Sequence, residues 1–142
     1  MSTSRELAEQ IEQLGKTVAA CNQRRAARQG TTPARVKLLQ VLARCGSSKM
    51  GDLGRELQVT PRNVTKLVDR LEHEGLVTRA PHPRDRRATL IQATLAGLEV
   101  AARYAARPTD LVAALDQFSP VEQVTLQQLL EKLQRNLETD VR

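Results

Sequence analysis

The chain has 142 residues, enough for one domain with extensions, and its 40% hydrophobic and 27% charged residues are typical of a globular protein. Its net charge of +6 and isoelectric point near 10.0 favour an acidic partner, either a nucleic acid or an anionic membrane surface. The sequence has one tyrosine, one phenylalanine and no tryptophan, which argues against single-stranded nucleic acid because such binding depends on aromatic stacking.

Several other classes of protein are excluded by what the sequence does not contain. No apolar run approaches the roughly 20 residues of a membrane span, and the polar N-terminus lacks the core of a secretion signal, so we expect a cytoplasmic protein. There is no glycine-rich phosphate loop and no cluster of cysteine and histidine, the only histidines being His73 and His82. We therefore expect no enzyme activity, no metal site and no cofactor.

The first predicted elements are two helices. One covers about residues 4–28, because apolar residues recur there at steps of four and three, namely Leu7, Ile11, Leu14, Val18 and Cys21. The segment QGTTP ends it, and Thr32-Pro33 begins the second as N-cap and first-turn proline. The second helix is predicted to be mostly buried through Val36, Leu38, Leu39, Val41 and Leu42.

Two shorter helices follow, with the spacing of a helix-turn-helix. The first covers about residues 49–57; the second begins at Thr60-Pro61 and ends at Gly75, a typical residue after a helix C-cap. Leu53 and Leu57 are expected to face the second helix, with Gly54 allowing the backbones to approach. This spacing alone is moderately specific.

The outward face of that second helix carries most of the functional signal. If Val64, Leu67, Val68 and Leu71 point inward, then Arg62, Lys66, Asp69 and His73 lie opposite, flanked by Asn63, Thr65 and Arg70. Side chains of these types bind base edges or phosphates in a DNA major groove. For an isolated helix, a merely solvated face is the favoured interpretation, and the basic hairpin that follows changes this balance.

The segments LVTRA and ATLIQ, which flank PHPRDRR, predict a β-hairpin, because two prolines in the connector are incompatible with a helix. Arg84, Arg86 and Arg87 lie at its tip, where arginines contribute little to a fold. They favour contact with a neighbouring minor groove or its rim. Asp85 lies two residues from Arg87, and we expect it to orient that guanidinium.

The remainder is again helical. Thr94 is predicted to cap a long helix that runs to about residue 117 and is kinked or broken at Pro108. The capping box from Ser119 to Glu122 opens a last helix with leucines at 126, 129, 130, 133 and 137. Terminal apolar stripes that the middle unit cannot cover predict a homodimer, with an interface that includes Leu7, Ile11, Leu14, Val18, Leu126, Leu130, Leu133 and Leu137.

The run VTKLVDRLEHEGLVTRAPHPRDRRATLIQATLAG resembles the winged-helix DNA-binding domain of MarR-type transcriptional regulators. The matching pieces are LVDRLEHEGLVTR, the DRR of the wing (residues 85–87) and T-x-x-G (Thr94 and Gly97), and FSPVEQVTLQQLLEKL is similar to the family's final helix. The resemblance covers about residues 32–140. It implies a mainly α fold with a small β-hairpin wing, divided into an N-terminal dimerisation helix (1–31), a winged helix-turn-helix domain (32–92) and C-terminal dimerisation helices (93–142).

The resemblance also implies a function: a homodimer that binds pseudo-palindromic double-stranded operator DNA, usually as a repressor, and releases it when a small molecule or oxidant binds. The residues expected to contact DNA are Thr60, Arg62, Asn63, Thr65, Lys66, Arg70, Arg84, Asp85, Arg86 and Arg87. The alternative is a winged helix that serves only protein–protein contacts. No membrane partner is expected, because the basic residues do not line one continuous helix face opposite large aromatics.

Three features depart from the family or stay open. Pro108 lies inside the fifth helix, and the charged residues common after the wing threonine are here Leu95 and Ala96. One branch of the family senses peroxides through a cysteine in its first helix, and Cys21 occupies such a helix. Cys21 continues the apolar stripe, however, so we expect it to be a small buried residue, and Cys45 to be a core residue at a helix end. The sequence does not define the residues of an effector site.

Overall fold

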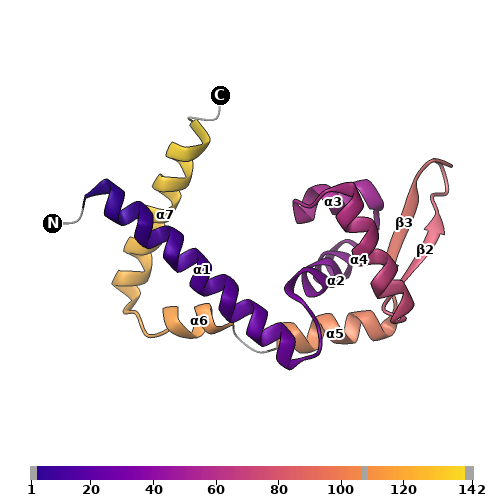
Figure 1. Ribbon diagram of the computed structural model, residues 1–142, viewed down its shortest axis with the longest axis horizontal. Coiled ribbons are helices and arrows are strands. Elements are labelled where there is room, and N and C mark those ends of the chain that lie inside the picture. The colour runs from indigo at the N-terminus through magenta and orange to yellow at the C-terminus, as the bar shows by residue number, and fades with distance from the viewer. Residues whose placement is uncertain (1–2, 107–108, 140–142) are drawn as a thin grey trace. The chain divides into compact units, whose positions relative to one another are not determined.

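The computed structural model describes residues 3–106 and 109–139. As predicted, the chain is mainly α-helical with one small sheet (Figure 1). In chain order the elements are α1 Ser4–Arg28, α2 Pro33–Cys45, β1 Ser47–Lys49, α3 Met50–Leu57, α4 Pro61–His73, β2 Val77–Pro81, β3 Thr89–Ala93, α5 Leu95–Ala105, α6 Asp110–Leu115 and α7 Pro120–Thr139. Two compact units divide between positions 107 and 108, and each is described by itself.

Local capping chemistry sets the helix ends, as the sequence predicted. The side chains of Thr32, Thr60 and Thr94 each accept a hydrogen bond from a backbone N–H in the first turn of α2, α4 and α5, respectively. At the end of α4, Gly75 has a φ of +75°, and the N–H of Leu76 donates to the carbonyl of Leu71 at 2.9 Å. This Schellman arrangement favours glycine at position 75 and directs the chain from α4 into β2.

The sheet has three strands, one more than predicted. β3 lies in the middle, and β2 and β1 pair with it antiparallel on either side, so that Ile91 is opposite both Arg79 and Ser48. The sequence predicted only the β2–β3 hairpin. The polar SSK segment follows the end of α2 and has no alternating apolar pattern that would indicate β1. Figure 1 shows the β2–β3 hairpin projecting beyond the helices of its unit.

One core holds the first unit together and orients α4. Its fully buried side chains come from α2, α3, α4, β2 and β3, including Leu38, Leu39, Leu42, Leu53, Val64, Val68, Leu71, Val77 and Ile91. Because Val64, Val68 and Leu71 point into this core, the opposite face of α4 must face outward. The hydrophobic core is therefore what presents the polar face of α4.

Two glycines differ in how tightly they are packed. A methyl group on Gly54 would lie 3.5 Å from the Val59 carbonyl oxygen and 3.6 Å from Val64, which is ordinary van der Waals contact. The α3–α4 crossing at Gly54 therefore has room for alanine as well as glycine. A methyl group on Gly97 would instead overlap the carbonyl oxygen of Leu76 and lie 3.2 Å from Leu39. The close approach that requires glycine is between α5 and the turn after α4.

The helices outside this core expose apolar side chains. In α1, Ala26 is buried beside Val36 and Tyr104, but Leu7, Ile11 and Leu14 are about half exposed and Val18 is half-buried. In the second unit, α6 and α7 bury no residue completely: Leu126 is half-buried, whereas Leu130, Leu133 and Leu137 are exposed. The described residues thus leave these apolar stripes uncovered.

The helix predicted to run from Thr94 to about residue 117 is divided into α5 and α6. The predicted break at Pro108 falls outside the described residues. The capping box of α7 is confirmed: Ser119 N–H donates to Glu122 at 3.0 Å, and Glu122 N–H donates to the Ser119 hydroxyl at 3.2 Å. Hydrogen bonding from the Ser119 backbone N–H, and to a smaller extent from the Ser119 side chain, lowers the pKa of the Glu122 carboxyl. Among the described residues, no helix is both long enough and apolar enough to cross a bilayer.

Candidate nucleic-acid interface

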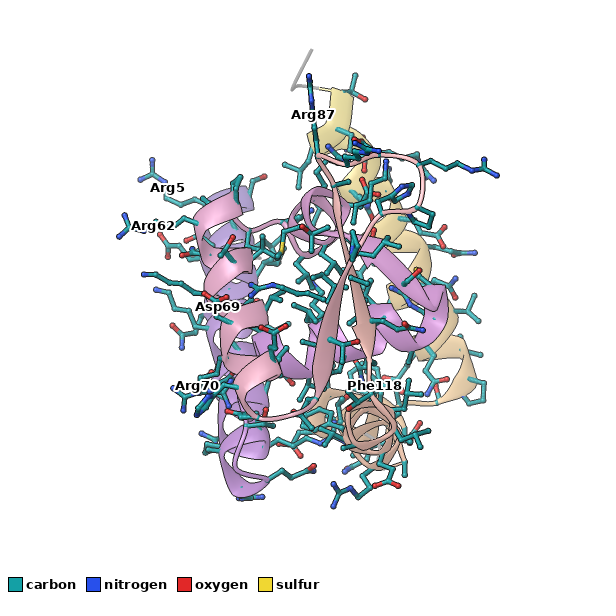
Figure 2. The ribbon with its side chains drawn as sticks, turned by 90° about the vertical axis from the view of Figure 1, so that its right-hand side faces the viewer. Arg5, Arg62, Asp69, Arg70, Arg87 and Phe118 are labelled. Atoms are coloured by element: carbon teal, nitrogen blue, oxygen red, sulfur yellow. The ribbon has the colours of Figure 1, made fainter. Side chains whose placement is uncertain are left out.

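The outer face of α4 presents two cations at its beginning. Arg62 and Lys66 are exposed, and Figure 2 shows Arg62, Asp69 and Arg70 projecting away from the core. Arg62 and Lys66 make no ion pair with any residue that the structure describes. The predicted inward and outward faces of α4 are confirmed, and the first half of its outer face carries positive charge.

Other polar side chains of α4 are engaged locally. The Thr60 hydroxyl accepts from Asn63 N–H at 3.2 Å, and the Thr65 hydroxyl donates to the Pro61 carbonyl at 2.9 Å. The Arg70 Nε lies 3.1 Å from Glu74 Oε1, and this oxygen also pairs with Arg35 of α2 at 3.1 Å. The Glu74 carboxylate therefore links α2 and α4, and it partly neutralises Arg70.

A second ion-pair network joins α4 to the hairpin. Arg79, in the middle of β2, directs one guanidinium nitrogen to Asp69 at 2.5 Å and the other to Glu72 at 3.2 Å. The Arg79 side chain is only 29% exposed, whereas the Asp69 and Glu72 side chains are 58% and 42% exposed. One arginine thus pairs with two carboxylates on α4, offsets one of their two negative charges, and holds the helix against the strand that leads into the hairpin tip.

The hairpin tip carries three exposed arginines, at positions 84, 86 and 87, as predicted; Figure 2 shows Arg87 at its end. The predicted role of Asp85 is wrong in its geometry. Asp85 Oδ1 accepts a hydrogen bond from the backbone N–H of Arg87 at 3.0 Å, and no ion pair joins it to a guanidinium of the described residues. A side-chain oxygen of an aspartate readily accepts from the backbone N–H two residues later, which forms an Asx-turn. Asp85 therefore fixes the backbone of the tip.

Sequence reasoning missed three residues of this surface: Arg35, Arg79 and His82. Arg79 shares a strand face with buried Val77, so the alternation of side chains along a strand could have indicated that it points toward α4. His82 Nδ1 accepts from the backbone N–H groups of Arg84 at 3.1 Å and Asp85 at 3.0 Å. No pattern in the sequence indicated the pair between Arg35 and Glu74, which depends on how α2 crosses α4.

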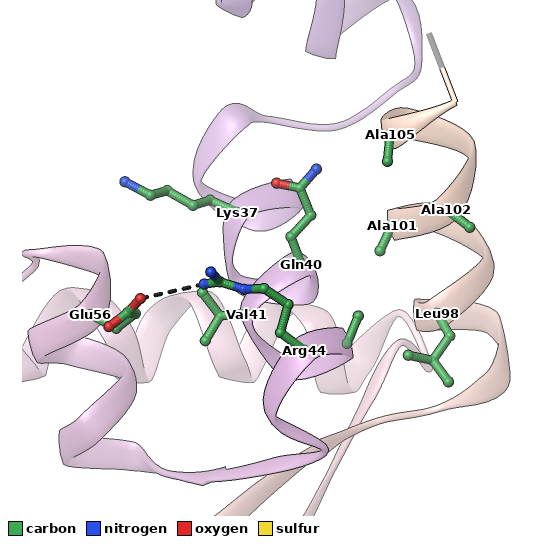
Figure 3. A pocket seen from close by; sticks show the side chains of 10 residues that line it. Lys37, Gln40, Val41, Arg44, Glu56, Leu98, Ala101, Ala102 and Ala105 are labelled. Carbon is green, nitrogen blue, oxygen red and sulfur yellow. Dashed lines mark hydrogen bonds and ion pairs between the residues drawn. The ribbon is translucent and has the colours of Figure 1, made fainter. Parts of the chain in front are cut away.

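A groove lies between α2 and α5 and has a volume of about 560 Å³ (Figure 3). Its floor is apolar, formed by Val41, Leu98 and three alanines of α5, at positions 101, 102 and 105. At its edge are Lys37 and Arg44, and Arg44 pairs with Glu56 of α3 at 3.4 Å. An apolar floor with a cationic edge suits a small amphipathic anion.

We expected both cysteines to be buried, but neither is. Cys21 is partly exposed, and its sulfur lies 3.3 Å from a guanidinium nitrogen of Arg24, while Cys45 is exposed at the end of α2. Both are free thiols. In the described part of the chain, no group of three or more histidine, cysteine or acidic side chains could hold a metal ion.

Comparison with known proteins gives a consistent result. Residues 31–89 match the model of the MarR family. The HTH-type transcriptional repressor MdtR of Bacillus subtilis is 30% identical over 114 residues, which are 80% of this chain and 74% of MdtR. The transcriptional activatory protein BadR of Rhodopseudomonas palustris is 36% identical over 75 residues, or 51% of this chain and 43% of BadR.

Solved structures agree with the sequence relatives. A cysteine-to-serine mutant of MarR from E. coli, in complex with operator DNA, superposes with a TM-score of 0.77 at 25% identity, covering 89% of this chain and 92% of that one. YusO of Bacillus subtilis gives 0.67 at 25% identity, covering 94% and 99%. The coverage and identity of MdtR, together with the family match over the helix-turn-helix and wing, show that this chain belongs to the MarR family of winged helix-turn-helix transcriptional regulators.

Proposed function

We propose that two copies of this chain bind pseudo-palindromic double-stranded DNA and thereby regulate transcription. The observation that carries the proposal is the pairing of two basic elements on one unit: the first turns of α4, with Arg62 and Lys66, and the arginine-tipped hairpin that Arg79 ties to α4. A helix of this kind fits a major groove, and a projecting basic hairpin reaches the next minor groove. The ten residues predicted to contact DNA lie on α4, at its N-cap Thr60, or in the hairpin tip.

The proposal also covers whether the protein represses or activates transcription, where in the cell it acts, and whether it catalyses a reaction. Repression is favoured because MdtR, a relative that matches over most of both chains, is named a repressor, although BadR is named an activatory protein. We place the protein in the cytoplasm, where its DNA is, and assign it no enzymatic reaction and no cofactor. The groove between α2 and α5 is our candidate site for an anionic effector, and Cys21 is the candidate for an oxidant signal.

The test of DNA binding uses a duplex that the wild-type chain selects from a random pool of about 30 base pairs. If Arg62 or Lys66 contacts a base edge, its replacement by alanine should weaken binding by about 1–3 kcal/mol and relax the preference at one position in each half-site. If it contacts phosphate, binding should weaken for all sequences, with a smaller salt slope. Fluorescence anisotropy across a salt series measures both.

The control for these variants is Lys132→Ala, which removes one positive charge from α7, in a segment whose net charge is −3 (three basic and six acidic residues in 108–142). It should leave the affinity and the salt slope unchanged. Failure of the wild-type chain to select any duplex would instead favour a winged helix that serves only protein–protein contacts.

Dimerisation is the second prediction of the proposal. Half-exposed Leu7, Ile11 and Leu14 lie on one face of α1, so a second copy should cover them. Ile11→Glu places two charges in a symmetric interface and should raise the dimer dissociation constant by at least about a hundredfold. Gln13→Glu adds the same charge on another face and should have little effect. Sedimentation at micromolar concentration checks both; a wild-type chain that sediments as a stable monomer would contradict the dimer.

A further inference from the structure

His82 lies between two prolines where β2 enters the hairpin tip. Its Nδ1 accepts two backbone hydrogen bonds, from Arg84 N–H at 3.1 Å and from Asp85 N–H at 3.0 Å. Its own N–H donates to the Ala88 carbonyl at 3.2 Å, across the base of the tip. A single residue therefore holds both sides of the loop that carries the arginines.

Asp85 adds two more hydrogen bonds within the hairpin tip. Its side chain accepts from Arg87 N–H at 3.0 Å, and its carbonyl accepts from Ala88 N–H at 3.1 Å. Because His82 fixes the N–H of Asp85, it also fixes the residue that holds the backbone of Arg87. The path of the chain through Arg84 and Arg87 thus depends on one acceptor atom, His82 Nδ1.

We propose that His82 is the positioning residue of the wing, and that the acceptor at its Nδ1 makes DNA binding by the tip depend on pH. The inference rests on the proposed DNA-binding function and deepens it. A fixed backbone loses less conformational entropy when its arginines bind phosphate or a groove, so the ordered tip binds DNA more tightly than a disordered one.

The pH dependence follows from the chemistry of imidazole. A neutral ring has one acceptor nitrogen, whereas an imidazolium has none, so protonation removes both hydrogen bonds at Nδ1. His82 lines a second groove, between β1, α3 and the hairpin tip. The charged groups in this groove are Lys49 of β1, Asp52 of α3 and Arg84, and Asp85 is next to it in the tip. Asp52 is itself paired with Arg55.

Acidification has a second, opposite effect. Positive charge added to the DNA-facing surface strengthens its attraction to phosphate. The change in the wild-type chain alone is therefore ambiguous. The informative quantity is the affinity of the wild type relative to a variant that keeps the acceptor but cannot titrate.

The chain offers such a pair of variants at this position. His82→Asn places an oxygen at the same distance along the side chain as Nδ1, and asparagine accepts from N–H groups two and three residues later. His82→Leu has a similar branched shape without any acceptor. The two variants lose the same ring and the same titratable group, so the difference between them reports the acceptor alone.

The experiment measures the affinity of the three proteins, as full chains, for the duplex selected by the wild type, at pH 7.5 and 5.5. At pH 7.5 we expect His82→Asn to bind within about twofold of wild type and His82→Leu to bind about 5–30-fold more weakly. At pH 5.5 the wild-type affinity should fall toward that of His82→Leu, and His82→Asn should keep its advantage. Amide hydrogen exchange at Arg84 and Asp85 should be faster in His82→Leu, without DNA, at an unchanged melting temperature.

The outcomes separate the two hypotheses. If no duplex is selected, the proposed function fails, while faster exchange in His82→Leu would still show that His82 orders the tip. If the wild type binds DNA but His82→Leu binds equally well, His82 does not position the wing. If all three proteins share one pH profile, the acceptor at Nδ1 does not make binding depend on pH. Either result contradicts the inference.

Discussion

Replacing Gly97 with alanine should destabilise the first unit by about 3 kcal/mol, near the upper end for overpacking of a core. The added methyl group would overlap the carbonyl oxygen of Leu76. That oxygen cannot simply move, because it accepts the Thr94 N–H at 3.0 Å, and the Thr94 hydroxyl donates to the neighbouring Gly75 carbonyl at 2.7 Å. Thermal unfolding should show a melting temperature at least about 10 °C lower.

The other glycines provide matched controls for this change. Gly51 lies in the exposed first turn of α3 with no atom within 4 Å of an added methyl group, and Gly54 offers ordinary van der Waals distances. Alanine at either position should therefore be neutral or stabilise by about 0.5–1 kcal/mol, because it restricts the unfolded chain. A Gly97→Ala protein as stable as Gly51→Ala would show that α5 can shift away from the turn after α4.

The parts of the fold that the sequence predicted are those determined by neighbouring residues. Each of Thr32, Thr60 and Thr94 caps a helix through an N–H only three residues away, and the apolar spacing of α4 determines which of its faces is buried. Gly75 ends α4 for an equally local reason, its positive φ. Such signals act within one or two helical turns, so they can be recognised without knowledge of tertiary structure.

The features that sequence reasoning missed depend on residues far apart in the chain. β1 forms a strand because β3 lies beside it, about 40 residues later, and not because SSK has strong strand propensity. The need for glycine at position 97 rather than 54 is determined by how closely α5 approaches the turn after α4. The partner of Asp85 was misjudged because a carboxylate near an arginine can bind either its guanidinium or its backbone N–H, and sequence spacing does not distinguish them.

The Arg79 network leads to the second large prediction. Arg79→Gln should weaken binding to the selected duplex by about 5–30-fold, or about 1–2 kcal/mol, a value reduced from that of a buried pair because the carboxylates are partly exposed. Without the guanidinium, the Asp69 and Glu72 carboxylates would face the DNA phosphates unneutralised, and α4 would lose its tie to β2. Anisotropy across a salt series, with Lys132→Gln as the control for net charge, measures the loss.

A second set of variants separates charge neutralisation from positioning. If Arg79 acts by neutralising α4, then adding Asp69→Asn and Glu72→Gln to Arg79→Gln should restore most of the affinity, because all three charges are then absent. If it acts by holding α4 against the hairpin, the triple variant should bind as weakly as the single one, since none of the amides restores the charged link. We expect partial recovery, because both carboxylates belong to α4 and the ion pairs bridge α4 to β2. If Arg79→Gln itself bound DNA with wild-type affinity, the network would contribute neither charge neutralisation nor positioning. The core alone would then orient α4 and the wing.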